Sequence, residues 1–265
     1  MFNIAICIPT YKPSYYIINC LQSIEDQTLS KDKFKVYIAL NGSEKSYEVY
    51  IQEILKKFSF NYKLFFLEEA GVSNARNFLI DHSNEDYIVF VDDDDILSLN
   101  YIEELLHVSS SNIMGISNVY NFYGNLNELK KSYIGLCFKN LPEITYSKFK
   151  SRKYYSSPCA KMLHRNIISN TRFDTKLSIG EDSLFMAQLS HRVKAVRKTS
   201  PSACYYVNER AGSATRKKID KEKELKRILY SLTTYSKMLL TFRYGTLFIL
   251  TRIVATLIHG KKLIK

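Results

Sequence analysis

The sequence predicts an α/β fold, in which helices cover both faces of a parallel sheet, followed by a separate helical tail. Three observations support this prediction. Short apolar runs alternate with segments of helical periodicity through the first 92 residues, polar clusters follow several of these runs, and the chain becomes basic after residue 215. Alternating strands and helices are typical of parallel sheets, because each parallel connection needs a crossover.

The predicted strands are short and rich in Ile, Val, Phe and Tyr. They are the runs NIAICIP, FKVYIAL, YKLFFLE and DYIVFVD, and residues 16–27 and 47–58 between them carry apolar residues at helical spacing. Ligands of such sheets bind beyond the carboxyl ends of the strands. Polar residues lie there in three places, Pro9-Thr10-Tyr11, Asn41-Gly42-Ser43 and Asp92 to Asp95. We therefore expect the site along one edge of the sheet.

The pattern is less regular after residue 99. The run NIMGISNVYNFYG predicts one strand, residues 125–155 an irregular region with a strand or short helix, and residues 158–168 and 182–191 two helices. Residues 217–265 continue as a helical pattern whose apolar side consists of Leu225, Ile228, Leu229, Leu232, Leu239 and Phe242. We expect two units, residues 1–215 and residues 216–265.

The composition is that of a globular protein, with 265 residues of which 46% are hydrophobic and 24% charged. The N-terminal MFNIAICIPTYK lacks the basic region and long apolar run of a signal peptide, so we expect an intracellular protein. The five cysteines are scattered and form no C-x-x-C pair, which argues against a disulfide framework and a thiolate metal site. We expect buried thiols.

The net charge of +12 is concentrated in the tail. Residues 216–265 hold 13 Lys and Arg against three Asp and Glu, a net charge of +10, which leaves +2 for residues 1–215. A nucleic-acid-binding protein is disfavoured, because the charge lies beside apolar tail helices and no nucleic-acid-binding motif is evident.

Four consecutive aspartates, Asp92 to Asp95, follow the fourth predicted strand. One interpretation is a solvated turn in which Asp95 or Ser98 caps the following helix. The other is a site for Mg²⁺ or Mn²⁺, which keeps one or two protein carboxylates and completes its shell with water and substrate phosphate. A P-loop is absent, and the cluster does not close a first strand as in phosphatases that use an aspartate nucleophile.

Four motifs in order carry a resemblance to a known family. The chain resembles the family 2 inverting glycosyltransferases of the GT-A fold over residues 3–213, through ICIPTYK (6–12), AGVSNARN (70–77), FVDDDD (90–95) and GEDSLF (180–185). The resemblance implies a Rossmann-like, mixed but mainly parallel sheet with helices on both faces.

The resemblance also implies a nucleotide site. Pro9, Thr10 and Tyr11 correspond to the nucleotide-binding loop, in which Tyr11 would stack on the base. Asn41 stands where the family usually has an acidic residue that accepts a hydrogen bond from the base, so a uracil preference is less secure here. Arg76 would lie near the base or the diphosphate as a fork donor.

The D-x-D element of the family corresponds to Asp92-Asp93-Asp94. Asp92 and Asp93 would lie on the nucleotide side, Asp94 would be the metal ligand bridged to the diphosphate, and Asp95 would support the site. Asp182 matches the catalytic base, with Glu181 the less favoured candidate.

Three further residues are candidates for the acceptor or phosphate side. Lys161 lies in a segment that resembles the acceptor wall, and it could contact an anion or a sugar. Arg210 and Ser213 lie in a segment that resembles the stretch closing over the nucleotide. Each of the three could equally be an ordinary surface residue.

The tail segment TLFILTRIVATLI has 13 residues with Arg252 near its middle. A membrane-spanning helix needs about 20 apolar residues, so spanning is not expected. A basic amphipathic helix on an anionic membrane fits better. Helices packed on the core, or a homo-oligomer contact through them, are the alternatives.

Taken together, the resemblance implies a metal-dependent hexosyltransferase-type enzyme that moves a sugar from a nucleotide-diphosphate sugar, with a UDP-sugar favoured, to a saccharide or lipid-linked saccharide. It would work in the cytoplasm at the inner membrane surface, in capsule, other surface polysaccharide or glycolipid synthesis. The alternative is a non-catalytic nucleotide-sugar-binding subunit. The sugar, base and acceptor stay open.

Overall fold

A computed structural model describes residues 3–210 and 221–261 of the chain. Its central sheet has eight strands in the order β3-β2-β1-β4-β10-β6-β11-β9. Their bounds are β1 Ile4–Thr10, β2 Phe34–Asn41, β3 Tyr62–Leu67, β4 Tyr87–Phe90, β6 Ile113–Ile116, β9 Ile144–Thr145, β10 Lys161–His164 and β11 Ala195–Lys198.

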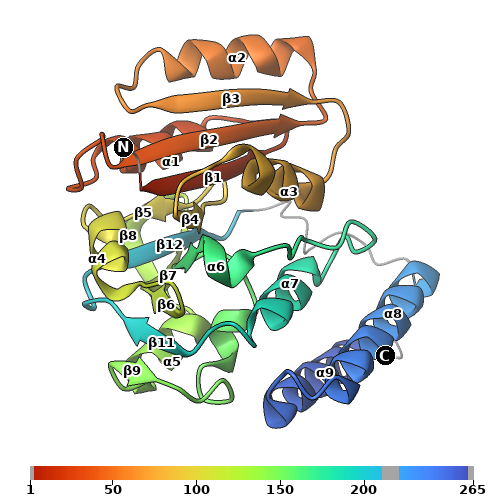
Figure 1. The fold of residues 1–265 in the computed structure, drawn as a ribbon. Coiled ribbons are helices and arrows are strands. Elements are labelled where there is room, and N and C mark those ends of the chain that lie inside the picture. The colour runs from red at the N-terminus through yellow and green to blue at the C-terminus, as the bar shows by residue number, and fades with distance from the viewer. Residues whose placement is uncertain (1–2, 211–220, 262–265) are drawn as a thin grey trace.

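This sheet is mixed but mainly parallel, as predicted. Strands β1 to β4 are parallel where they pair, and so are β6 and β11, whereas β10 runs antiparallel to both of its neighbours. All seven residues of β1 are buried. A strand buried along its whole length needs cover on both faces, and Figure 1 shows α1 and α3 on opposite sides of β1 and β2.

The helices of the N-terminal unit, residues 3–210, follow the predicted alternation of strands and helices. The helix predicted at 16–27 ends at residue 25, and the one predicted at 47–58 begins and ends earlier. Their bounds are α1 Tyr16–Glu25, α2 Lys45–Leu55, α3 Val72–His82, α4 Tyr101–Val108, α5 Tyr133–Asn140, α6 Arg165–Ile168 and α7 Glu181–Leu189, with a 3₁₀ turn at Arg152–Tyr155.

A smaller sheet of four strands, in the order β5-β12-β7-β8, lies beside the central one. Its strands are β5 Ile96–Leu97, β7 Asn118–Tyr123, β8 Asn125–Lys131 and β12 Cys204–Asn208. The single strand predicted across residues 112–124 is therefore two strands, β6 and β7, in different sheets. The chain changes sheet at the fully buried Ser117, whose N–H bonds to Ala160 O (3.2 Å) outside either ladder.

Two other local predictions are wrong. Residues 158–168 are not one helix, because β10 inserts between β4 and β6 and only α6 is helical there. Met162 and Leu163 are both fully buried, because β10 is covered on both faces. The strand therefore lacks the alternation of buried and exposed residues that would distinguish it from a buried helix. Neither Asp95 nor Ser98 caps the next helix: α4 begins after Asn100, because β5 intervenes.

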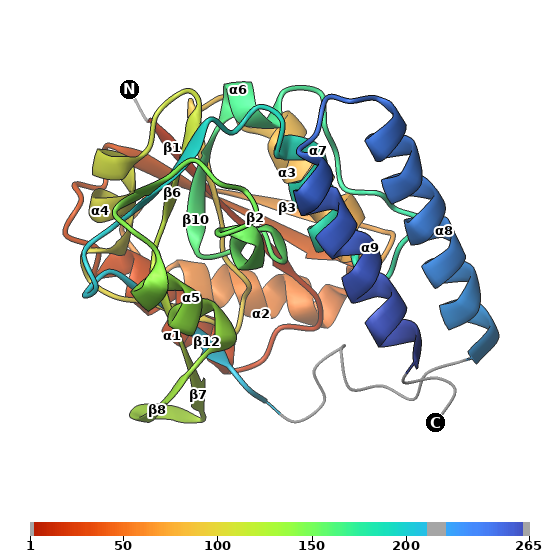
Figure 2. The ribbon, with the colours of Figure 1, turned by 90° about the horizontal axis from the view of Figure 1, so that it is seen from below.

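The tail is helical, as predicted, and consists of α8 Lys221–Leu240 and α9 Thr246–Lys261. The two helices pack on each other and lie alongside α7 (Figure 2). The predicted apolar side is wrong in part, because Leu225, Leu229 and Phe242 are exposed. The buried side of α8 is Ile228, Ser231, Tyr235 and Met238, a stripe at helical spacing.

Helix α9 packs against the N-terminal unit through its first two turns. Phe248 and Ile249 are buried in the main core, and the Phe248 ring lies 4.9 Å from the ring of Tyr155. Among the residues that the structure describes, no helix is both long enough and apolar enough to cross a membrane.

Because Phe248 belongs to the shared core, we expect Phe248→Ala to lower the free energy of unfolding of the whole chain by about 3–5 kcal/mol. Phe242→Ala is the matched control, since this ring is 89% exposed, and it should change stability by less than about 0.5 kcal/mol. Urea denaturation followed by circular dichroism measures both. Equal small effects would mean that the tail does not share the core.

Candidate active site

The predicted polar clusters meet at the carboxyl edge of β2, β1 and β4. Thr10 ends β1 and donates its hydroxyl hydrogen bond to Asp93, which follows β4. Asn41 ends β2, donates to Thr10 O (2.6 Å) and accepts from Gly71 N–H (2.8 Å). The buried Asn41 amide therefore ties β1 to the loop that precedes α3.

Tyr11 stands at the rim of this edge and is half exposed, whereas Pro9 and Thr10 are buried in β1. Its ring lies against the backbone of Gly42, which has a φ of +67°; a Cβ there would come within 2.9 Å of both the Tyr11 ring and Ala70 Cβ. Only glycine fits such a left-handed, crowded position without strain. The half-exposed Tyr11 ring can stack on a planar group, and the Lys12 ammonium group lies 5.6 Å from its centre.

Arg76, on α3, links the acidic cluster to the candidate base. Its guanidinium is 3% exposed and donates to Asp92 Oδ1 (2.9 Å) and to Asp182 Oδ1 (2.6 Å). Burial works against its charge, but Asp182 and Asp92 outweigh this effect and raise the pKa of Arg76. The fork expected near the nucleotide is thus used on two carboxylates that lie 90 residues apart in sequence.

Two of the four aspartates are structural anchors. Asp93 is 7% exposed, and burial raises its pKa to about 7 against the hydrogen bond from Thr10. Asp95 is buried and accepts from Asn208 N–H (2.8 Å), which ties the cluster to β12. The supporting role expected for Asp95 agrees with this contact.

Asp94 faces a different partner. Its carboxylate forms an ion pair with Arg210, whose guanidinium lies 4.3 Å from the centre of the Tyr16 ring. Burial and Asp92 raise the pKa of Asp94, while Arg210 lowers it. A cavity of about 330 Å³ borders Asp94 and Arg210. The Arg210 guanidinium compensates the charge of Asp94. A divalent metal ion at the same carboxylate would compensate it too.

The acidic cluster suits a metal that shares its shell with a substrate. Within residues 3–210 and 221–261, no group of three or more His, Cys, Asp or Glu side chains is placed to hold a metal ion. Mg²⁺ and Mn²⁺ commonly take only one or two protein carboxylates when a diphosphate supplies the rest. Asp94 fits this minimal ligand set.

Asp182 and Glu181 occupy the first turn of α7. Asp182 keeps a quarter of its side chain exposed, and its pKa is raised by burial and lowered by Arg76. Glu181 is 7% exposed, its Oε2 has no partner among the described residues, and burial raises its pKa to about 7. Burial raises the pKa of both carboxylates, which makes them better proton acceptors, and Asp182 is the more accessible of the two.

The remaining candidates are placed differently. Lys161 is 1% exposed on β10 and donates to Ser157 O and Cys159 O (2.5 Å each), so its ammonium group is engaged inside the protein. Burial lowers its pKa to about 7. Ser213 lies outside the described residues.

Sequence reasoning missed Tyr205 and Phe173. The Tyr205 hydroxyl accepts from Asp92 N–H (3.1 Å), and the Phe173 ring lies 5.3 Å from the Arg76 guanidinium. Tyr205 belongs to the YYVNERAGS stretch that includes Arg210, and alternation along a strand could have indicated it. Phe173 stands in a loop and gives no sequence signal.

A mainly parallel sheet whose carboxyl edge carries an acidic cluster, faced by a carboxylate at a helix N-terminus, defines a GT-A-type nucleotide-sugar transferase fold. The chain belongs to glycosyl transferase family 2, because the model of that family matches residues 5–170. The predicted family and fold class are confirmed.

Several bacterial proteins are similar to this chain over part of their own length. The minor teichoic acid biosynthesis protein GgaB of Bacillus subtilis (strain 168) is 23% identical over 248 residues, which are 90% of this chain and 26% of GgaB. The poly(ribitol-phosphate) beta-N-acetylglucosaminyltransferase TarS of Staphylococcus aureus (strain MW2) is 22% identical over 219 residues, 80% of this chain and 36% of TarS. The chain thus spans well under half the length of either relative.

Solved structures show the same fold. Residues 1–349 of S. aureus TarS in complex with UDP-GlcNAc match with a TM-score of 0.71 at 22% identity, covering 90% of this chain and 67% of that chain. The same protein in complex with UDP matches with a TM-score of 0.68 at 20% identity, covering 90% of this chain and 66% of that chain.

The buried Lys161 gives a pH test of the site's packing. Its pKa is about 7 in the folded protein and about 10.4 in an unfolded chain, so the unfolded chain binds more protons between these values. Stability should therefore rise from pH 7 to pH 10, and we expect Lys161→Met to remove at least about 1 kcal/mol of this rise.

The measurement is urea denaturation at several pH values. Lys139→Met, at an exposed lysine of α5, is the control and should keep the wild-type slope. An unchanged slope in Lys161→Met would contradict the lowered pKa.

Proposed function

We propose that the protein transfers a sugar from a nucleotide-diphosphate sugar to a hydroxyl acceptor, with inversion at the sugar C1. The observation that carries this proposal is the contact from Asp92 through Arg76 to Asp182. It joins the D-x-D element to a carboxylate in the first turn of α7, so that donor and acceptor groups would meet there.

Asp182 would act as the general base. Its Oδ1 is held by Arg76, while its other carboxylate oxygen makes no hydrogen bond with the described residues. That oxygen can accept the proton of an incoming hydroxyl, and Arg76 fixes the orientation of the carboxylate. Glu181 is the second candidate, because its carboxylate is adjacent and unpartnered at Oε2.

The donor site would lie at the carboxyl edge of β1, β2 and β4. Tyr11 would stack on the base, and Thr10 and Asn41 would shape the loop around it. Asp92 would face the nucleotide, while Asp93 would contribute to the nucleotide site through its hydrogen bond with Thr10. A UDP-sugar is favoured, and the UDP-GlcNAc bound in the related TarS structure supports this choice. Arg210 and Ser213 would close on the phosphate side.

A divalent cation, Mg²⁺ or Mn²⁺, would be held by Asp94 together with the donor diphosphate, and when bound it stabilises the departing charge. The raised pKa of Asp94 is consistent with this role, since a cation relieves the repulsion from Asp92. Arg210 would leave Asp94 when the metal enters.

Assembly of a surface polymer is the biological role that the relatives support, because the names of GgaB and TarS refer to teichoic acid and poly(ribitol-phosphate). A saccharide, lipid-linked saccharide or polyol phosphate would be the acceptor. The protein would work in the cytoplasm at the inner face of the membrane.

The outer side of α9 supports contact with an anionic membrane surface. Five of its apolar side chains are between 42% and 57% exposed, namely Leu247, Leu250, Val254, Leu257 and Ile258. Exposed apolar side chains favour the headgroup region, and the net charge of +10 over residues 216–265 would add attraction to anionic lipids. Co-sedimentation with anionic liposomes tests this contact, and no binding at physiological salt would leave the homo-oligomer contact as the explanation.

The test of the catalytic assignment is Asp182→Asn, which preserves shape but removes the proton acceptor. Transfer should fall by at least about 10²-fold, the lower end of general-base contributions, while donor binding barely changes. Rates of sugar transfer and calorimetric donor binding measure the two effects. Glu181→Gln is the matched control.

A near wild-type rate in Asp182→Asn with a dead Glu181→Gln would move the base to Glu181. If neither change lowered transfer, the non-catalytic nucleotide-sugar-binding subunit would be the better description.

The metal assignment predicts that Asp94→Asn abolishes the strengthening of UDP binding by Mn²⁺, because the variant cannot supply a charged ligand. Isothermal titration with UDP, with and without Mn²⁺, gives this readout without any turnover. Asp86→Asn, with the same change of charge at the other end of β4, should retain the effect of Mn²⁺. A retained effect in Asp94→Asn would show that another group binds the metal.

A further inference from the structure

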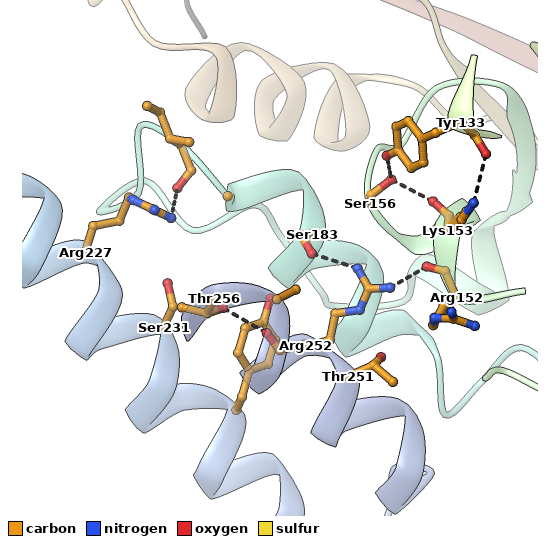
Figure 3. Close-up of a pocket in the computed structure, with 14 residues that line it drawn as sticks. Tyr133, Arg152, Lys153, Ser156, Ser183, Arg227, Ser231, Thr251, Arg252 and Thr256 are labelled. Atoms are coloured by element: carbon orange, nitrogen blue, oxygen red, sulfur yellow. Dashed lines mark hydrogen bonds between the residues drawn. The ribbon is translucent and has the colours of Figure 1, made fainter. Parts of the chain in front are cut away.

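A second cavity lies between the N-terminal unit, residues 3–210, and the tail helices α8 and α9. It has a volume of about 430 Å³, and it is bounded by Gly180 and Ser183 of the α7 N-terminus, by the 3₁₀ turn Arg152–Tyr155 and by α8 and α9 (Figure 3). It is separate from the cavity at Asp94, and no residue lines both.

The lining of this cavity is cationic. Arg152, Lys153, Arg227 and Arg252 contribute to it, whereas none of its lining residues is Asp or Glu. Arg227 shares its charge with Glu224 (side chains 15% and 12% exposed). The other three cations leave an excess of positive charge.

Arg252 is the centre of this charge. It is 8% exposed, and its two terminal nitrogens donate to neutral oxygens, Ser183 Oγ (3.2 Å) and the backbone carbonyl of Arg152. Its Nε has no partner among the described residues. A buried guanidinium without a carboxylate is costly unless an anion compensates it.

Other groups around Arg252 increase this cost. Burial lowers its pKa, and the neighbouring Arg152 lowers it further. Lys153 points its ammonium group at Tyr133 O (3.3 Å) on the same wall. Among the described residues, these three cations have only neutral oxygens and aromatic rings as partners, so an anion in the cavity would balance their charge.

The position of the cavity connects it to the candidate base. Gly180 and Ser183, which line the cavity, flank Glu181 and Asp182 in sequence. Arg252 donates to Ser183 Oγ, while Arg76 donates to Asp182, the residue before it in the same turn. The partial positive charge of the α7 N-terminus adds to the attraction for an anion.

We propose that this cavity binds a phosphodiester group of the acceptor, next to the hydroxyl that receives the sugar. The proposal rests on the proposed function, because it takes Asp182 as the point where the acceptor reacts. Arginine forks and helix N-termini both suit phosphate oxygens.

A phosphodiester within a hydroxylated chain fits the cavity better than a lipid headgroup. Ser156, Ser231, Thr251 and Thr256 add hydroxyl groups to its wall, and the 42–57% exposed apolar side chains of α9 that would touch a membrane are not among its lining residues. The acceptor would therefore be an anionic polyol- or sugar-phosphate chain.

The test is titration calorimetry of the full chain with glycerophosphoglycerol, a soluble phosphodiester, and with glycerol as the neutral control. Wild type should bind the diester and not glycerol. Arg252→Gln should weaken this binding at least about tenfold, since a charge-assisted contact is lost. Arg243→Gln, an exposed tail arginine outside the cavity, should bind as wild type does.

Lys153→Gln is a second variant, on the half-buried rim, in case Arg252→Gln does not fold. It should also weaken diester binding several-fold. UDP binding with Mn²⁺ should be unchanged in both variants, which separates this proposal from the donor site. If wild type did not bind UDP in the presence of Mn²⁺, the proposed function would be refuted, whatever the result with the diester.

Diester binding of equal strength in wild type, Arg252→Gln and Lys153→Gln would overturn the proposal. The absence of diester binding in wild type would also overturn it. If wild type then bound phosphatidylglycerol vesicles in a way that depends on Arg252, the cavity would be a headgroup site.

Discussion

The active-site region depends on one buried cation. Arg76 lies between Asp92 and Asp182, and without it these carboxylates would stand close together with no compensation. Such a buried ion group is rarely retained for stability alone, because desolvation offsets most of its attraction. Its use here is geometric: it fixes the strand-end cluster relative to the first turn of α7, so that the two halves of the site keep one arrangement.

The four adjacent aspartates are tolerated because each has a different partner. Asp92 pairs with Arg76, Asp93 with Thr10, Asp94 with Arg210 and Asp95 with the backbone of Asn208. Burial still raises the pKa of Asp93, Asp94 and Asp95, so the cluster remains short of positive charge. This shortage is the physical reason why a divalent cation is expected where Asp94 faces a cavity.

Arg252 shows the opposite case of a buried guanidinium. Arg76 is balanced by two carboxylates, whereas Arg252 donates to neutral oxygens and lies 5.1 Å from the centre of the Phe248 ring. Both arginines contact the first turn of α7, Arg76 through Asp182 and Arg252 through Ser183. The tail is therefore not a separate appendage on its inner side: Phe248 packs on Tyr155 of the 3₁₀ turn, and Arg252 bonds to Ser183 on the helix that carries Asp182.

The sequence by itself determined the alternation of strands and helices, the site at the strand ends and the family, because these features are local patterns of polarity and motif. It misassigned residues 158–168, since a strand buried on both faces has no alternation that distinguishes it from a buried helix. It also left Asp182, Arg76 and Lys161 as separate candidates. Only the tertiary structure decided that Arg76 joins Asp92 to Asp182. It also decided that Lys161 is turned inward and that Arg252 faces the N-terminal unit. Sequence patterns do not show these features, because burial and pairing of charges depend on contacts between residues far apart in the chain.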